Sequence, residues 1–127
     1  MSKFSLISID AIKGKIKFFK LVKDGKCEFD EFETEARKNF SNELFKIFAY
    51  MDRVSNLMSM SSDKFRDITQ KREKVKEYEF KTRHLRVYVI KEEQSGNIII
   101  CGGYKNTQER DIKHFRELKK EYLKSKV

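Results

Sequence analysis

The stretch KVKEYEFKTRHLRVYVIKEEQSGNIIICGGY, residues 74–104, contains three apolar runs separated by two short polar segments. The middle run, 85–91, alternates between two sets of side chains, which is typical of a β-strand. The last run, 97–104, is apolar at almost every position, which is typical of a central strand covered on both faces. Because the links are too short for a crossover, these two runs and the first, 74–81, are predicted to form an antiparallel meander.

In the residues before this stretch, the spacing of apolar side chains is first typical of β-strands and then typical of a helix. Short apolar runs at 4–9 and 14–22 predict strands, and the Asp-Gly pair within 23–26 predicts a turn. Over 29–57 the apolar residues are spaced by three or four positions, which predicts one long helix or two helices in line. The weak helix formers NFSN at 39–42 indicate a break between two helices.

The residues after the meander predict a final helix. Asn106 and Glu109 have the spacing of a capping box, and the helical pattern runs to about Ser125. The predicted fold is α+β, with an antiparallel sheet of three to five strands packed on a helical layer. One face of that sheet is expected to lie on the helices and the other to be free. The length of 127 residues predicts a single domain over 1–127.

Charge and composition narrow the classes of function. The chain has 29 Lys and Arg against 20 Asp and Glu, a net charge of +9, so a polyanionic partner is favoured, although a solvated basic surface without a partner gives the same count. The 11 Phe and 5 Tyr exclude a disordered chain. Two distant cysteines indicate free thiols, and no apolar stretch is long enough to cross a bilayer, so a soluble cytoplasmic protein is expected. Neither metal-ligand spacing nor a phosphate-binding glycine motif is present, so no metal or cofactor is expected.

The polar positions of the meander and its ends gather basic and aromatic side chains on the predicted free face. The candidate site residues are Glu79, Lys81, Arg83, His84, Arg86, Tyr88, Tyr104 and Lys105. Antiparallel pairing brings them within a few strand spacings, and such crowding of positive charge costs stability unless a ligand such as phosphate offsets it. Alternatively, the lysines and arginines only protect strand edges from aggregation. His114, expected in the middle of the last helix, is predicted to have no role.

Three segments in order carry a family resemblance. They are FFKLVKDGKCEFDEFETEA (18–36), EYEFKTRHLRVYVI (77–90) and GGYKNTQERDIKHFRELKKEYLKS (102–125). The first segment resembles the strand, glycine turn and acidic-aromatic helix start of the RelE/HigB-like toxins of bacterial toxin–antitoxin modules. The second segment resembles the strand pair of that family. The third resembles its glycine corner and the helix that follows. The resemblance covers about 15–125 and leaves 1–13 outside as an N-terminal extension.

The resemblance implies a microbial-RNase-like α+β fold and cleavage of mRNA, usually on the ribosome, with inhibition by a cognate antitoxin protein. By position, Arg86 matches the arginine of the family's strand pair, while Glu79 and Lys81 take the places of the glutamate and arginine before it. Lys105 matches the first lysine of the corner. Asn106 replaces the second lysine, and the proline common before the last helix is absent.

Cleavage of RNA without a metal needs a base, an acid and cations around the phosphate. Arg83 and Arg86 are expected to bind the phosphate in bidentate fashion. Lys81 is expected to act as the base, because neighbouring positive charges disfavour the ammonium form of an amine. Replacement of Arg86 is expected to abolish activity and to spare the core.

The remaining candidates have supporting roles. Tyr104 or His84 is expected to be the acid or a platform for base stacking, and Lys105 to neutralise charge. Glu79 and Tyr88 are expected to border the RNA. The partners expected are the antitoxin, mRNA and the ribosome, without a membrane.

Two alternatives stay open. The ParE branch shares this fold and poisons DNA gyrase without cutting RNA. A non-catalytic module would use its basic sheet to bind an acidic protein or a nucleic acid. Dependence of toxicity on the candidate residues separates the first alternative from an endoribonuclease.

Overall fold

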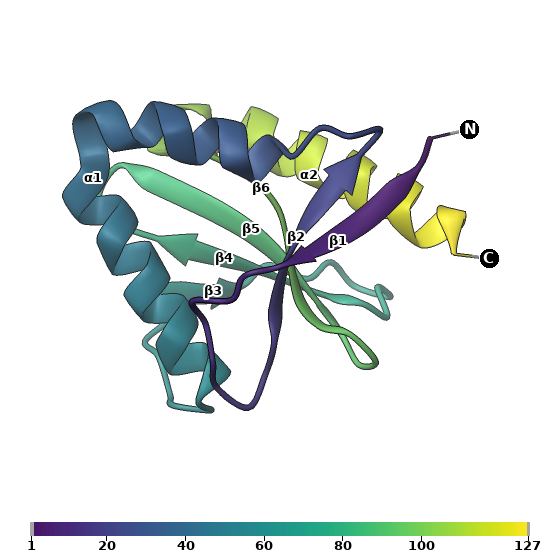
Figure 1. Ribbon diagram of the computed structural model, residues 1–127, viewed down its shortest axis with the longest axis horizontal. Helices are drawn as coiled ribbons and strands as arrows, with labels where there is room; N and C mark the ends of the chain where they lie inside the picture. The colour runs from purple at the N-terminus through teal and green to yellow at the C-terminus, as the bar shows by residue number, and fades with distance from the viewer. Residues whose placement is uncertain (1, 127) are drawn as a thin grey trace.

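A computed structural model describes residues 2–126, which form an α+β fold of one six-stranded sheet and two helices (Figure 1). The elements are β1 (Phe4–Ser8), β2 (Phe18–Lys23), α1 (Glu28–Ser55), β3 (Phe65–Asp67), β4 (Lys76–Lys81), β5 (Leu85–Glu92), β6 (Gly96–Tyr104), the 3-10 turn η1 (Lys105–Thr107) and α2 (Gln108–Ser125). The predicted α+β class is therefore confirmed, as are the predicted meander β4–β5–β6 and both long helical segments.

The sheet is larger than predicted and is mixed. Its strand order is β1-β2-β6-β5-β4-β3. All neighbours are antiparallel except β2 and β6, which run parallel with Phe18 opposite Asn97. The connection from β2 to β6 contains α1, β3, β4 and β5, which is long enough for the crossover that a parallel pair requires. No local pattern indicated this pairing, and no strand was predicted at the three-residue β3.

The prediction of one free sheet face is wrong, because the two helices cover opposite faces. Alternate residues of β5 divide between two cores: Val87 packs with α1, whereas Tyr88 packs with α2. Helix α2 buries Phe115, Leu118 and Tyr122 against the second face. The signal for this second layer was present in β6, whose run is apolar on both faces.

Helix α1 is bent where the sequence predicted a break. Phe40 has a non-helical backbone (φ −133°, ψ 36°) in the middle of the helix, and Figure 1 shows the change of direction. The first half begins with acidic residues, as the helix dipole favours. The bend places the side chain of Phe40 beside His84 and Tyr104, which lie at the ends of the meander strands.

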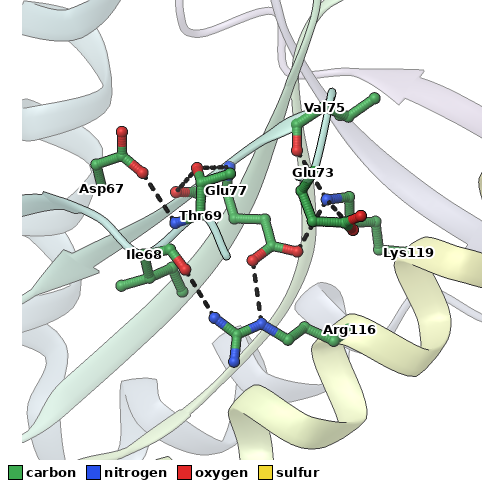
Figure 2. Close-up of polar contacts among 8 residues, drawn as sticks. All are labelled: Asp67, Ile68, Thr69, Glu73, Val75, Glu77, Arg116 and Lys119. Carbon is green, nitrogen blue, oxygen red and sulfur yellow. Dashed lines mark hydrogen bonds and ion pairs between the residues drawn. The ribbon is translucent and has the colours of Figure 1, made fainter. Parts of the chain in front are cut away.

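Helix α2 is fixed to the sheet by a buried ion network (Figure 2). Glu77 of β4 is fully buried and accepts hydrogen bonds from Arg116 Nε at 3.0 Å and from Lys119 Nζ at 2.8 Å. Arg116 also donates to the backbone oxygen of Ile68, and Lys119 donates to that of Val75. Because these charges have opposite or polar partners, the cost of removing them from water is offset. We call these contacts the Glu77 network.

The start of α2 differs from the predicted capping box. Its N-cap is Thr107, which makes no side-chain cap bond, and Asn106 lies in η1. The hydroxyl of Thr107 instead donates to Asp111 Oδ2 at 2.6 Å. A Cβ at Gly103 would collide with the carboxylate of Asp111, so glycine at this position lets the first turn of α2 lie directly against β6.

Candidate functional site

The structure divides the eight predicted site residues into a buried group and a surface group. Glu79, Arg86 and Tyr88 are buried on the sheet face that α2 covers. The surface group consists of Lys81, Arg83, His84, Tyr104 and Lys105, which are half-buried or exposed at one end of the meander. The alternation of β4 and β5 was therefore predicted correctly, but the face that it defines is closed by a helix.

The buried group is held by protein contacts. Glu79 accepts hydrogen bonds from Arg66 at 3.1 Å and from Gln108 at 2.6 Å. Arg86 donates to the backbone oxygens of Thr82 at 2.6 Å and Leu85 at 2.8 Å. The expectation that Arg86 lies on an open surface and can be removed without loss to the core is contradicted by its 5% exposure. Burial raises the pKa of Tyr88 far above its usual range, so its hydroxyl stays protonated.

Three members of the surface group, His84, Tyr104 and Lys105, line a groove of about 520 Å³. Its lining residues are Phe40, His84, Tyr104, Lys105 and Asn106. They come from the bend of α1, from the turn between β4 and β5, and from the junction of β6 with η1. The ring centroid of Phe40 lies 4.8 Å from that of His84 and 5.9 Å from that of Tyr104. Three segments that are far apart in sequence thus build one aromatic floor.

A carboxylate orients the imidazole of His84 in this groove. His84 Nδ1 lies 2.6 Å from Glu43 Oε2, while Glu43 Oε1 accepts hydrogen bonds from the Thr82 hydroxyl at 2.5 Å and from the His84 backbone amide at 2.7 Å. Burial raises the pKa of Glu43, but these hydrogen bonds outweigh it and hold the pKa below its usual value. With Glu43 ionised, Nδ1 is the donating nitrogen and Nε2 is left to exchange a proton with a ligand.

Tyr104 contributes its ring more than its hydroxyl. The hydroxyl donates to Glu35 Oε1 at 2.8 Å. Burial raises the pKa of Tyr104 to about 12, and the bond to Glu35 and its negative charge act in the same direction. The phenol is therefore neutral near pH 7 and its proton is already shared, which makes it a poor acid or base.

Of the predicted cations Lys81, Arg83 and Lys105, Lys105 alone lines the groove. Arg83 is exposed in the turn before His84. Lys81 is half-buried opposite Arg86 at the end of β4, so its side chain points to the sheet face that α2 covers. None of the ion pairs formed within residues 2–126 includes Lys81, Arg83 or Lys105. Their charges are thus available to an anionic ligand.

Sequence reasoning did not find Glu43 and Phe40, which complete this site from α1. They lie about 40 residues before His84, and no spacing rule connects a helix residue to a strand turn at that distance. The only signal was the predicted break at 39–42, which marks the place where the helix changes direction. His114, predicted to have no role, pairs with Glu28 at 2.8 Å and does not line the groove.

Residues 2–126 show neither a metal-binding arrangement nor a membrane-spanning helix. In the part of the chain that the structure describes, no group of three or more His, Cys, Asp or Glu side chains has an arrangement that could hold a metal ion. None of its helices is both long enough and apolar enough to cross a membrane. Comparison with protein-family models, curated proteins and solved structures found no match to the chain. The chemistry of the groove must therefore be read from its own side chains.

Proposed function

We propose that the protein is an endoribonuclease of the toxin–antitoxin type, which cleaves mRNA in the groove beside His84 and acts in the cell on the message bound to the ribosome. The observation that carries this proposal is the His84–Glu43 pair at 2.6 Å, set in a groove with aromatic and cationic walls. Imidazole is the side chain best suited to proton transfer near neutral pH, and an adjacent carboxylate fixes its tautomer.

The proposed reaction needs no group outside the chain and the RNA. His84 Nε2 takes the proton of a ribose 2′-hydroxyl, and the 2′-oxygen attacks the adjacent phosphorus. The bond from phosphorus to the 5′-oxygen breaks, and the imidazolium returns the proton to that oxygen, directly or through water. The products are a 2′,3′-cyclic phosphate and a 5′-hydroxyl. Lys105 and Arg83 stabilise the negative charge of the transition state.

This assignment changes the roles that the sequence suggested. His84 replaces Lys81 as the base, since Glu43 orients its ring whereas no carboxylate orients Lys81. Arg86 is removed from contact with RNA because it is buried and its Nη1 donates to two backbone oxygens. Lys81 lies on the sheet face of Arg86 and is removed with it, whereas Arg83 remains as a cation near the phosphate.

The order of elements also supports the proposal. The toxin resemblance implies a strand, a glycine turn, an acidic helix start, a strand pair, a glycine corner and a final helix. The chain has β2, the turn at Gly25, α1, β4–β5, the Gly102–Gly103 corner and α2 in that order. A RelE-like, microbial-RNase-like fold is accordingly part of this proposal, as is neutralisation by a cognate antitoxin.

The test uses two histidines with matched surroundings. His84 and His114 are both about half exposed, and each pairs with one glutamate. His84→Gln is expected to lower the rate of RNA cleavage by about 100-fold or more, the usual contribution of a general base, whereas His114→Gln should retain it. The readout is growth arrest on induction with primer extension on cellular transcripts, and end analysis of the RNA fragments for 2′,3′-cyclic phosphate.

The results also separate the alternatives. An oligonucleotide with a single 2′-deoxyribose at the cleavage position should resist cleavage there. Growth arrest with intact transcripts and trapped gyrase would favour the ParE-like function. Binding of RNA without arrest or cleavage would favour a non-catalytic module. Full activity of His84→Gln would remove this groove as the active site.

A further inference from the structure

The floor of the groove is aromatic although the molecule is unusually rich in charge. The ring of Phe40 packs against both the ring of His84 and the ring of Tyr104, so a ligand would lie on these rings and not between them. Behind them Phe32 packs on Tyr104 with centroids 5.6 Å apart, and Phe32 is part of the main core. The floor is therefore rigid, because its rings are backed by buried side chains.

The position of Phe40 interrupts the regular helical geometry of α1. Its backbone leaves helical geometry, and its ring is only half-buried. Phe45, five residues later on the same helix, is 77% exposed and does not line this groove. An exposed phenylalanine alone is thus no sign of a binding site here. What distinguishes Phe40 is its contact with two other rings at a concave surface.

The rim of the groove has two features that complement a nucleotide. Lys105 supplies a positive charge without an acidic partner, next to the exposed Arg83. Asn106 lines the groove with a side-chain amide, which can both donate and accept hydrogen bonds. Amides of this kind pair with the edges of bases, and aromatic rings stack on the faces of bases that are not already stacked.

We propose that Phe40 and Tyr104 form the stacking surface of a subsite for one nucleobase of single-stranded RNA, and that Asn106 contacts the edge of that base and sets base preference. This inference rests on the proposed function and adds to it the form of the substrate. The base lies on the rings, and its phosphodiester lies toward His84 and Lys105. Double-stranded RNA, whose bases are stacked on each other, is excluded from this subsite.

The stacking surface is tested by binding, without any cleavage. Adenosine, guanosine, cytidine and uridine 5′-monophosphates are titrated into the full chain and followed by NMR, with ribose 5-phosphate as the probe that lacks a base. At least one nucleotide should bind about tenfold or more tightly than ribose 5-phosphate, within the range for one base–aromatic stack. Phe40→Ala should abolish the difference, Phe40→Trp should keep it, and Phe45→Ala should leave it unchanged.

The stacking surface and the role of Asn106 would be contradicted by different results. Equal binding of ribose 5-phosphate and all four nucleotides would overturn the stacking surface, as would a base-dependent difference that survives in a folded Phe40→Ala variant. Asn106→Ala should keep the preference for nucleotides over ribose 5-phosphate and reduce the differences among the four. An unchanged order of affinities in that variant would overturn the role of Asn106.

His84→Gln separates this inference from the proposed function. It should keep a preference for nucleotides over ribose 5-phosphate, which depends on the rings of Phe40 and Tyr104, while losing cleavage. Base-dependent binding in a protein that never cleaves RNA would leave the subsite standing and refute the endoribonuclease. Cleavage that depends on His84 but not on Phe40, with no base-dependent binding, would refute the subsite and leave the endoribonuclease standing.

Discussion

Two regions of the molecule combine a glutamate of one element with a basic side chain of another, and they use the pair differently. In the Glu77 network the glutamate is fully buried, and Lys119 beside it is 2% exposed (Figure 2). At the groove Glu43 is partly buried, but its partner His84 is 46% exposed. The first pair joins a helix to the sheet, whereas the second holds an imidazole at a surface that a ligand can reach.

Burial decides whether a charged pair joins two elements or stays accessible to a ligand. In the Glu77 network Lys119 donates to Glu73, to the backbone oxygen of Val75 and to Glu77, so its ammonium has no donor left for a ligand. At the groove Glu43 takes only one nitrogen of His84, and Lys105 and Arg83 have no acidic partner. Charged pairs with a free bonding position are candidates for function, and fully occupied buried pairs are candidates for stability.

The comparison predicts the largest loss of stability at the buried pair. Glu77→Ala leaves Lys119 and Arg116 without their shared carboxylate, and removing one partner of a buried pair costs about 3–5 kcal/mol of unfolding free energy. Urea unfolding followed by circular dichroism measures it. A folded variant should still bind nucleotides at the groove.

The matching control is a surface pair. Lys23 and Glu121 join β2 to α2 with both side chains accessible to water. Glu121→Gln should leave the unfolding midpoint unchanged, because exposed ion pairs contribute little. An equal loss in Glu77→Ala and Glu121→Gln would contradict the distinction between the two kinds of pair.

The next effect is expected at Arg86, which holds the backbone beside the groove. Its guanidinium donates to the backbone oxygen of Thr82, and the Thr82 hydroxyl in turn donates to Glu43. Arg86→Ala should therefore lower the unfolding free energy by about 2–3 kcal/mol, through the loss of charge-assisted bonds to backbone carbonyls. It should also change the NMR chemical shifts of His84, whose backbone amide donates to the same carboxylate. An exposed phosphate clamp, as the sequence suggested, would instead lose activity with unchanged stability and unchanged His84 signals.

Arg86 also shows which features of the fold could be predicted from the sequence and which could not. Its alternation with Val87 correctly separated the two faces of β5, because side chains of a strand alternate whatever lies above them. What covers each face depends on α2, which begins 22 residues later, and on the parallel pairing of β2 with β6. The local sequence pattern of β5 predicts neither the packing of α2 on this face nor the parallel pairing. The candidates in turns, His84, Tyr104 and Lys105, did reach the surface, since loops and strand ends are seldom covered.

A smaller effect with a defined pH dependence is expected for Glu43→Gln. The pKa of Glu43 is lowered in the folded state, so the folded protein binds fewer protons than the unfolded chain between the two pKa values. Its contribution, about 1–2 kcal/mol for the charged hydrogen bonds, is complete above the usual glutamate range. It is lost as pH falls through the lower pKa of the folded state.

Unfolding free energies of the wild type and Glu43→Gln, measured from neutral pH down to pH 3, check this prediction. The difference should be constant near neutrality and should shrink in acid. A difference that grows as pH falls would mean that Glu43 is protonated in the native state, and that it does not orient His84 as a carboxylate.

The smallest effect is expected for Tyr104→Phe, which separates the two roles that the sequence left open for this residue. The substitution removes the bond to Glu35, an exposed carboxylate, and keeps the ring packed on Phe32 and Phe40. The unfolding free energy should change by less than about 1 kcal/mol, the usual net value of one hydrogen bond. RNA cleavage and nucleotide binding should both be retained, because a phenol with a pKa of about 12 that already donates to Glu35 is poorly placed to protonate a leaving oxygen. The measurement is the cleavage rate together with nucleotide titration, and Tyr104→Ala, which removes the ring, is the matched variant that should lose binding. If Tyr104→Phe lowers cleavage about 100-fold with unchanged binding, Tyr104 is the general acid, and the proton path through His84 alone is wrong.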